Sequence, residues 1–221
     1  MAQVWYDTGS FKGVIDANPL FWSPPLLFYL MKTLMHFGLS AEIAGVCLSI
    51  AFGTFTPLLT YGIAYEITQR KDISICSALL TAVNPAMNSL AIEVQRDMGY
   101  LFFIGIALWL LSAGIRRHKK RFWVYAGIVC GCSMLFRYET LEFLVIVPLI
   151  LLVLYVTKKS LRRNALCCGG LFLTSFFGVI ISMSFIMQTQ DYLFPSYRQY
   201  FQQKADMSNL YYPGLFEEPG K

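Results

Sequence analysis

The sequence predicts an all-α membrane protein, with about six transmembrane helices and one further helix at the outer face of the membrane. Of its 221 residues, 56% are apolar and only 14% are charged, and the mean hydropathy is +0.53. Soluble domains typically carry about 25% charged residues, so this composition excludes an ordinary soluble domain. The charges also cluster and leave apolar runs of about 18 residues or more, which is long enough to cross a hydrocarbon core.

The apolar runs alternate with charged turns, and each run is interpreted as one transmembrane helix. Asn84-Pro85 interrupts the second run, because proline removes a backbone N–H donor and leaves a carbonyl free. Together the runs predict one transmembrane unit over 41–187, between an extracytoplasmic and interfacial segment, 1–40, and an extracytoplasmic tail, 188–221. The six predicted spans are 41–68, 73–92, 98–115, 122–136, 141–157 and 165–187.

The distribution of basic residues predicts the orientation of these spans. If the first span runs from outside to inside, the turns 69–72, 116–121 and 158–164 are cytoplasmic and hold eleven of the eighteen Lys and Arg residues. With two acidic residues the inner side carries +9, and the other seven basic and eleven acidic residues give −4 outside. Short cytoplasmic loops carry such an excess of Lys and Arg. The formal net charge of +5 therefore indicates topology, and we expect membrane lipids but no nucleic acid as partners.

One apolar segment, 24–37, does not fit a span. Its length of about 14 residues is too short to cross the membrane, and a crossing here would move the basic turns to the outside. Pro24-Pro25 suits the start of a helix, where missing N–H donors cost nothing. Apolar residues alternate with Lys32 and His36. We therefore expect an amphipathic helix that lies in the outer interface.

Ionisable residues gather at the predicted outer face, just before the third span. Charged side chains at this depth are costly and mark candidate functional sites. Glu93 and Asp97 share a helical face if the third helix extends back to Glu93, and Arg96 and Tyr100 then lie beside them. Two carboxylates and an arginine suit an anionic substrate bridged by a divalent cation such as Mg²⁺ or Mn²⁺. The alternative is that Arg96 and Asp97 only cap a helix end, where the dipole favours a carboxylate.

A second charged group, Arg137-Tyr138-Glu139, follows the fourth span. Arg137 ends a segment in which Gly127 and Gly131 permit close helix packing. An arginine at this place has two interpretations. It is either an anchor that snorkels to the interface or a contact for the phosphate of a lipid-linked donor at the same depth.

Several segments resemble, in the same order, those of GT-C membrane glycosyltransferases, the group of protein O-mannosyltransferase-like (family 39) and aminoarabinose-transferase-like enzymes. The run 21–29, FWSPPLLFY, resembles their PPL-x-Y segment, and 41–69 resembles their next helix. Asn84-Pro85 followed by Glu93-x-x-Arg96-Asp97 resembles their second outer loop. The segment 123–139 resembles a helix that ends in a basic residue at the lipid-phosphate site. The resemblance extends to about residue 187.

The resemblance implies an enzyme that moves a hexosyl or pentosyl group, with inversion, from a polyprenyl-phosphate donor to a glycan, lipid or protein acceptor at the extracytoplasmic face. Asp97 and Glu93 would be catalytic carboxylates, with Asp97 as a ligand of a divalent cation. The short loops favour a bacterial inner membrane. The expected substrate-binding residues are Arg96, Arg137, Tyr100, Tyr138 and Glu139.

Enzymes of this group have an earlier transmembrane helix and an acidic outer loop before the PPL segment. Neither is recognisable before residue 21, and Asp7 and Asp16 do not occupy the acidic position. We therefore expect a copy that is incomplete at both ends. Two alternatives stay open: a non-catalytic membrane subunit or pseudoenzyme, which the missing acid favours, and a transporter fragment. An internal repeat, typical of transporters, is not recognisable.

Overall fold

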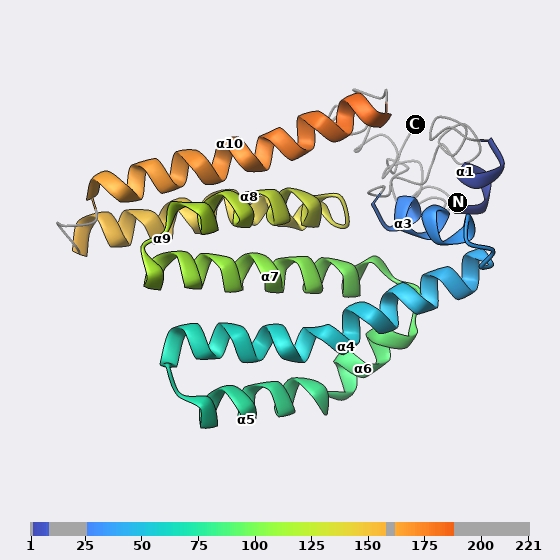
Figure 1. Ribbon diagram of the computed structural model, residues 1–221, viewed down its shortest axis with the longest axis horizontal. Helices are drawn as coiled ribbons and strands as arrows, with labels where there is room; N and C mark the ends of the chain where they lie inside the picture. The colour runs from blue at the N-terminus through green and yellow to red at the C-terminus, as the bar shows by residue number, and fades with distance from the viewer. Residues whose placement is uncertain (1, 9–25, 158–161, 188–221) are drawn as a thin grey trace, which may run out of the picture.

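The computed structural model describes residues 2–8, 26–157 and 162–187, and every regular element in these ranges is helical (Figure 1). The predicted all-α class is therefore confirmed for this part of the chain. Pro24-Pro25, Asp16 and the predicted tail 188–221 lie outside the described residues. The elements are α1 (Ala2–Thr8), α3 (Leu26–Met35), α4 (Ala41–Thr68), α5 (Lys71–Ala82), α6 (Pro85–Ile92), α7 (Arg96–Arg117), α8 (Lys120–Met134), the 3-10 helix η1 (Tyr138–Glu142), α9 (Phe143–Thr157) and α10 (Arg162–Met187).

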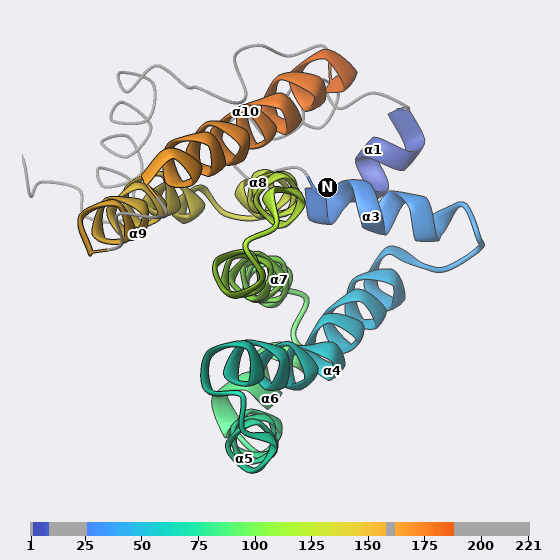
Figure 2. The same cartoon turned by 60° about the vertical axis from the view of Figure 1, so that its left-hand side comes forward.

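Helices that follow one another in the chain run in opposite directions, because short turns join them (Figure 1). Across the bundle the order is α10, α8, α7, α4 and α5, and each helix contacts the next. The same layering is visible in the second view, where α5 lies farthest from α10 (Figure 2). α7 is thus the central helix, between α4 and α8. The main core contains large side chains of α8 and α10, among them Trp123, Phe172 and Phe176.

Two helices in the described part of the chain, α4 and α7, are long and apolar enough to cross a membrane. A third crossing results if α5 and α6 form one span that is bent by 55° at the break between them. Helices α8 and α9 have only 15 residues each, which is short for a span. The described residues therefore support two or three spans by length and composition, and the predicted six are not confirmed.

Asn84 produces the break in the second predicted span. Its Oδ1 accepts a hydrogen bond from the N–H of Ala86 at 2.9 Å, and Pro85 occupies the first turn of α6, where its missing N–H is tolerated. The predicted interruption at Asn84-Pro85 is confirmed, but 73–92 is two helices and not one.

The basic turns lie at one end of the bundle. In Figure 1 the α4–α5 and α7–α8 turns are on the left, together with the end of α9 and the start of α10. Helix α3, the start of α7 and the end of α8 are at the opposite end. The alternation of the helices thus gathers the basic turns as the charge pattern predicts. The assignment of that end to the cytoplasm stays a prediction.

Helix α3 packs against the opposite end of the bundle through one face. Leu27, Met31 and Met35 are buried and are spaced by about one helical turn. The N–H of Leu26 donates to the carbonyl oxygen of Leu135 at 3.0 Å, which ties α3 to the end of α8. The helix predicted over 24–37 is confirmed for Leu26–Met35, and its place in the membrane interface stays a prediction.

Glycines bring α8 and α10 close together. A methyl group added at Gly127 would lie 3.0 Å from Cβ of Ser175 and closer still to the carbonyl oxygen of Phe172. One added at Gly131 would lie 3.0 Å from the carbonyl oxygen of Phe176. Since backbone atoms of α10 occupy this space, only glycine permits the observed approach. The predicted close packing of the fourth span is therefore confirmed.

Candidate functional site

The site begins with the start of α7 and the end of α8, which meet at the same end of the bundle. Asp97 lies in the first turn of α7, which is capped by Gln95 in an extended conformation (φ −122°, ψ 151°). Arg137 follows α8 and is also extended (φ −149°, ψ 136°). This geometry ends α8 and turns the chain into η1, which carries Glu139.

Arg137 joins these segments through two ion pairs. Its Nη1 donates to Oδ1 of Asp97, and its Nη2 donates to Oε1 of Glu139 at 2.7 Å. The guanidinium carbon lies 5.9 Å from the centre of the Tyr100 ring, within the range of a cation–π contact. The side chains of Arg137 and Asp97 are each 35% exposed and that of Glu139 is 50% exposed. The structure therefore brings together four of the predicted site residues in a place that ligands can reach.

The charges in this cluster stabilise one another. The hydrogen bond from Arg137 lowers the pKa of Glu139, and the charges of Arg137 and Arg96 lower it further. In turn, the hydrogen bond to Glu139 and the charge of Asp97 raise the pKa of Arg137. Arg137 is therefore a cation at any physiological pH, and Arg96 is near enough to act on the same carboxylate.

Glu93 does not join Asp97 on a helical face. It is the exposed C-cap residue of α6 and is extended (φ −90°, ψ 142°), and its carboxylate accepts a hydrogen bond from the side chain of Gln95. Because α7 begins at Arg96, the helix does not extend back to Glu93. The predicted shared face of these two carboxylates is therefore wrong. The catalytic role predicted for Glu93 stays untested, but Asp97 is the acid that contacts Arg137.

Tyr138 is the neighbour of Arg137 in the chain. It is half-buried, and its ring packs against the main core. Its predicted substrate-binding role stays a prediction.

A metal site at Asp97 is not preformed. Among the residues that the structure describes, no group of three or more His, Cys, Asp or Glu side chains is arranged to hold a metal ion. Asp97 already pairs with Arg137 through Oδ1. The described residues therefore show no ready-made set of metal ligands at Asp97, and the predicted cation stays a prediction.

A groove of about 410 Å³ lies between α4, α5, α6 and α7. Its wall on α7 includes Leu101, Ile104 and Leu108, which follow Asp97 at helical spacing and so lie on the same face of α7. Three threonines and Asn84 are the polar residues among those that line it. The groove therefore starts about one turn from Asp97 and continues along α7 into the apolar part of the bundle.

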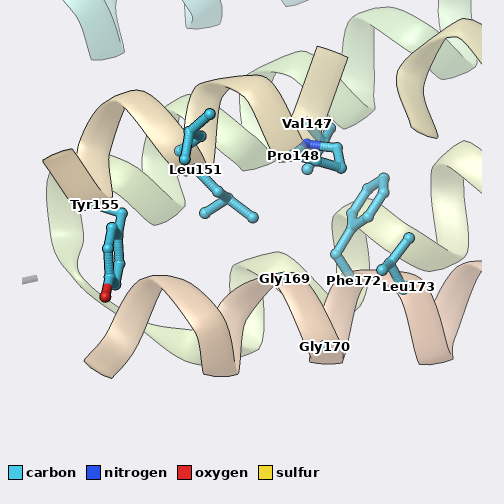
Figure 3. Close-up of a pocket in the computed structure, with 9 residues that line it drawn as sticks. Val147, Pro148, Leu151, Tyr155, Gly169, Gly170, Phe172 and Leu173 are labelled. Atoms are coloured by element: carbon cyan, nitrogen blue, oxygen red, sulfur yellow. The ribbon is translucent and has the colours of Figure 1, made fainter. Parts of the chain in front are cut away.

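A second groove of about 410 Å³ opens between α9 and α10 (Figure 3). Figure 3 shows Val147, Pro148 and Leu151 of α9 on one side, with Phe172 and the backbone of Gly169 on the other. No charged residue lines it. Apart from Tyr155, the described residues that line this groove have apolar side chains or are glycines, so the groove suits hydrocarbon.

Sequence reasoning missed the neutral residues that support Arg137. Phe136 is fully buried beside Gly99, where a side chain would collide with the Phe136 ring. Ser133 and Thr140 are also fully buried, and their hydroxyl oxygens are 3.2 Å apart. Serine, threonine and glycine are common in membrane helices, so no sequence pattern distinguishes these residues from others of the same type.

The opposite end of the bundle holds a different charged cluster. Glu66, only 4% exposed, accepts hydrogen bonds from Arg116 and Arg117. The Nη1 of Arg116 also donates to Oε1 of Gln69 at 3.2 Å. Glu66 is one of the two acidic residues counted in the inner charge of +9, and its ion pairs tie the end of α4 to the end of α7.

Comparisons with known proteins agree with this picture. A family model described as dolichyl-phosphate-mannose-protein mannosyltransferase matches residues 23–187, which is well over half of the chain. The match ends at the residue where the resemblance in the sequence ends. No curated protein and no solved structure matches the chain.

Proposed function

The chain belongs to the dolichyl-phosphate-mannose-protein mannosyltransferase family, a family of GT-C membrane glycosyltransferases, and from this premise we propose a more specific function. It transfers a sugar from a polyprenyl-phosphate donor to a glycan, lipid or protein acceptor at the extracytoplasmic face of a bacterial inner membrane. The observation that carries the proposal is the position of Arg137, paired with Asp97 and Glu139 at the end of a membrane bundle.

Arg137 is suited to the donor phosphate. A guanidinium presents paired N–H donors that match phosphate oxygens, and it keeps its charge in a partly buried place. Its two present partners are carboxylates that are themselves partly exposed, so a phosphate can take the place of one of them. Arg96, which acts electrostatically on Glu139, adds a second positive charge near this position.

The groove along α7 suits the lipid part of the donor. From Asp97 to Leu108 the helix rises about 16 Å at 1.5 Å per residue. A chain in this groove would therefore lie in the apolar part of the bundle while its phosphate is level with Arg137. Half of the residues that line the groove are leucine or isoleucine, which suit an isoprenoid chain.

In the proposed reaction Asp97 is the general base. When a phosphate oxygen replaces its carboxylate at Arg137, Asp97 is free to accept the proton of the acceptor hydroxyl. The acceptor oxygen then forms a bond to the anomeric carbon while the bond from this carbon to the phosphate oxygen breaks, which inverts the configuration. The electron pair stays on the departing polyprenyl phosphate, and Arg137 stabilises its charge. Tyr100 and Tyr138 would position the substrates.

The test uses the 221-residue chain in lipid nanodiscs, supplied with a radiolabelled polyprenyl-phosphate mannose and a mixture of acceptors. Arg137→Ala and Asp97→Asn should each lower label transfer at least about 100-fold, since a positioned acid–base group and a charge at the leaving group each contribute this much. Arg121→Ala, at the opposite end of the bundle, is the matched control and should be unchanged. Equal transfer by Asp97→Asn and the control would refute the role of Asp97. A chain that transfers nothing would favour a non-catalytic membrane subunit.

A further inference from the structure

Two buried hydroxyl groups close the turn that carries Arg137. Ser133 lies in the last turn of α8 and Thr140 lies in η1, and both side chains are fully buried. Oγ1 of Thr140 donates to the carbonyl oxygen of Arg137 at 2.9 Å and lies 3.2 Å from Oγ of Ser133. Loss of either contact would be costly, because a buried hydroxyl group has given up its hydrogen bonds to water and needs a partner in the protein to compensate.

The same two residues bind the backbone of Arg137 on both sides. The N–H of Arg137 donates to the carbonyl oxygen of Ser133 at 3.0 Å. Its own carbonyl oxygen accepts from the N–H of Thr140 at 3.3 Å as well as from the hydroxyl. The backbone N–H and the carbonyl oxygen of Arg137 are thus both hydrogen-bonded to residues whose side chains are fully buried.

The ion pairs alone are a weak means of fixing Arg137. Its guanidinium and both carboxylates are at least one-third exposed, and exposed ion pairs contribute little because water screens them. The buried hydroxyl pair has no such weakness. Oγ of Ser133 also lies 3.5 Å from the carbonyl oxygen of Tyr100, so the pair reaches the residue whose ring faces the guanidinium.

We propose that Thr140, together with Ser133, is a positioning residue that holds Arg137 beside Asp97 in the geometry that receives an anionic ligand. The pair acts through the backbone of Arg137 and does not touch the ligand. The proposal rests on the proposed function in one respect, namely that the ligand at Arg137 is a lipid-linked phosphate.

The first experiment needs no ligand and no activity. The folded chain in detergent is treated with phenylglyoxal, which modifies accessible guanidinium groups, and the rate at Arg137 is read from its peptide by mass spectrometry. Thr140→Val should raise this rate about fivefold, the factor expected for a lost hydrogen bond, while Thr140→Ser should restore it. Thr174→Val is the matched control, since that hydroxyl donates to Gly170 on the exposed side of α10. An unchanged rate in Thr140→Val would overturn the proposal.

The second experiment compares the affinities for a polyprenyl phosphate and for the uncharged polyprenol. The ratio of the two dissociation constants isolates the phosphate contact. Thr140→Val should reduce the preference for the phosphate about fivefold and leave binding of the alcohol unchanged, and Thr140→Ser should keep the preference. A general structural defect would weaken both ligands alike and would contradict a positioning role.

The two experiments also separate the proposals. If the native chain binds both lipids equally, the polyprenyl-phosphate donor is wrong, and the modification rates still decide the role of Thr140. If Thr140→Val does not fold, Ser133→Ala replaces it, because that change removes the partner hydroxyl and leaves the bond from Thr140 to the Arg137 carbonyl. Ser133→Ala should also raise the rate at which phenylglyoxal modifies Arg137. An unchanged rate would again overturn the proposal.

Discussion

Gly99→Ala is expected to damage the site without removing any charged or polar group. A methyl group at Gly99 would lie 2.6 Å from Cδ1 and 2.9 Å from Cζ of Phe136, and still closer to Cε1. The ring of Phe136 is fully buried and also packs edge to face against Phe52 at 5.8 Å, so it has little room to withdraw. Its backbone precedes Arg137, and a displaced ring therefore moves the residue that pairs with Asp97.

The magnitude follows from the overlap. Carbon atoms in contact prefer about 3.5–4.0 Å, so the ring must move by about 1 Å, and overpacking of this kind typically costs about 1–3 kcal/mol. At about 2–4 °C per kcal/mol for a chain of this size, the melting temperature in detergent should fall by several degrees. The rate at which phenylglyoxal modifies Arg137 should rise in the same variant.

Gly178→Ala is the matched control for this prediction. No atom lies within 4 Å of the position that its methyl group would occupy, so the same exchange should be neutral or slightly stabilising through helix propensity. Phe136→Leu, combined with Gly99→Ala, should recover part of the loss because the smaller side chain leaves space. A melting temperature for Gly99→Ala equal to that of Gly178→Ala would refute the reasoning.

Three further predictions test other contacts. Gly127→Ala should destabilise the chain by about 2 kcal/mol or more, because the methyl group meets the backbone of α10 and not a movable side chain; thermal unfolding beside Gly170→Ala, which has open space, is the measurement. Glu66→Gln should cost about 1–3 kcal/mol, measured by chemical unfolding, since the buried side chain at position 66 would lose its charged bonds to α7; an unchanged free energy of unfolding would show that these bonds do not stabilise the chain. Glu139 has a lowered pKa, so its contribution to stability is present above the ordinary value of 4.5 and is lost as the pH falls below it. The difference in melting temperature between the native chain and Glu139→Gln should therefore shrink between pH 6 and pH 3, and a constant difference would contradict this.

The sequence was sufficient for the helical class, for the order of the elements and for the gathering of the basic turns at one end. These features follow from the alternation of apolar runs and charged turns, which is a property of the whole chain. The ends of helices were harder to predict. The break at Asn84 depends on a side-chain cap, and the 3-10 turn at Tyr138–Glu142 is closed by bonds of the Thr140 hydroxyl to Arg137 and Ser133, which the pattern of apolar runs and charges does not record.

The charge pattern of the sequence predicted that Asp97, Arg137 and Glu139 lie at one end of the bundle, because ionised groups are rare in such an apolar chain and mark the ends of its helices. It did not decide which groups would pair. The position of Glu93 depends on where α7 begins, and the extended backbone at Gln95 separates this carboxylate from Asp97. Because α7 begins three residues after Glu93, the predicted pair of carboxylates is replaced by a carboxylate and an arginine.

The groups that a sequence search detects and the groups that fix their geometry are of different kinds. Charged side chains at the end of a membrane bundle must stay accessible to a ligand, so water screens their ion pairs and each pair alone contributes little. Rigidity must then come from neutral contacts that water does not reach. In this chain these are the ring of Phe136 against Gly99 and the hydroxyl pair of Ser133 and Thr140. Substitutions at such neutral residues should therefore impair binding at Arg137 even though none of them can contact the ligand.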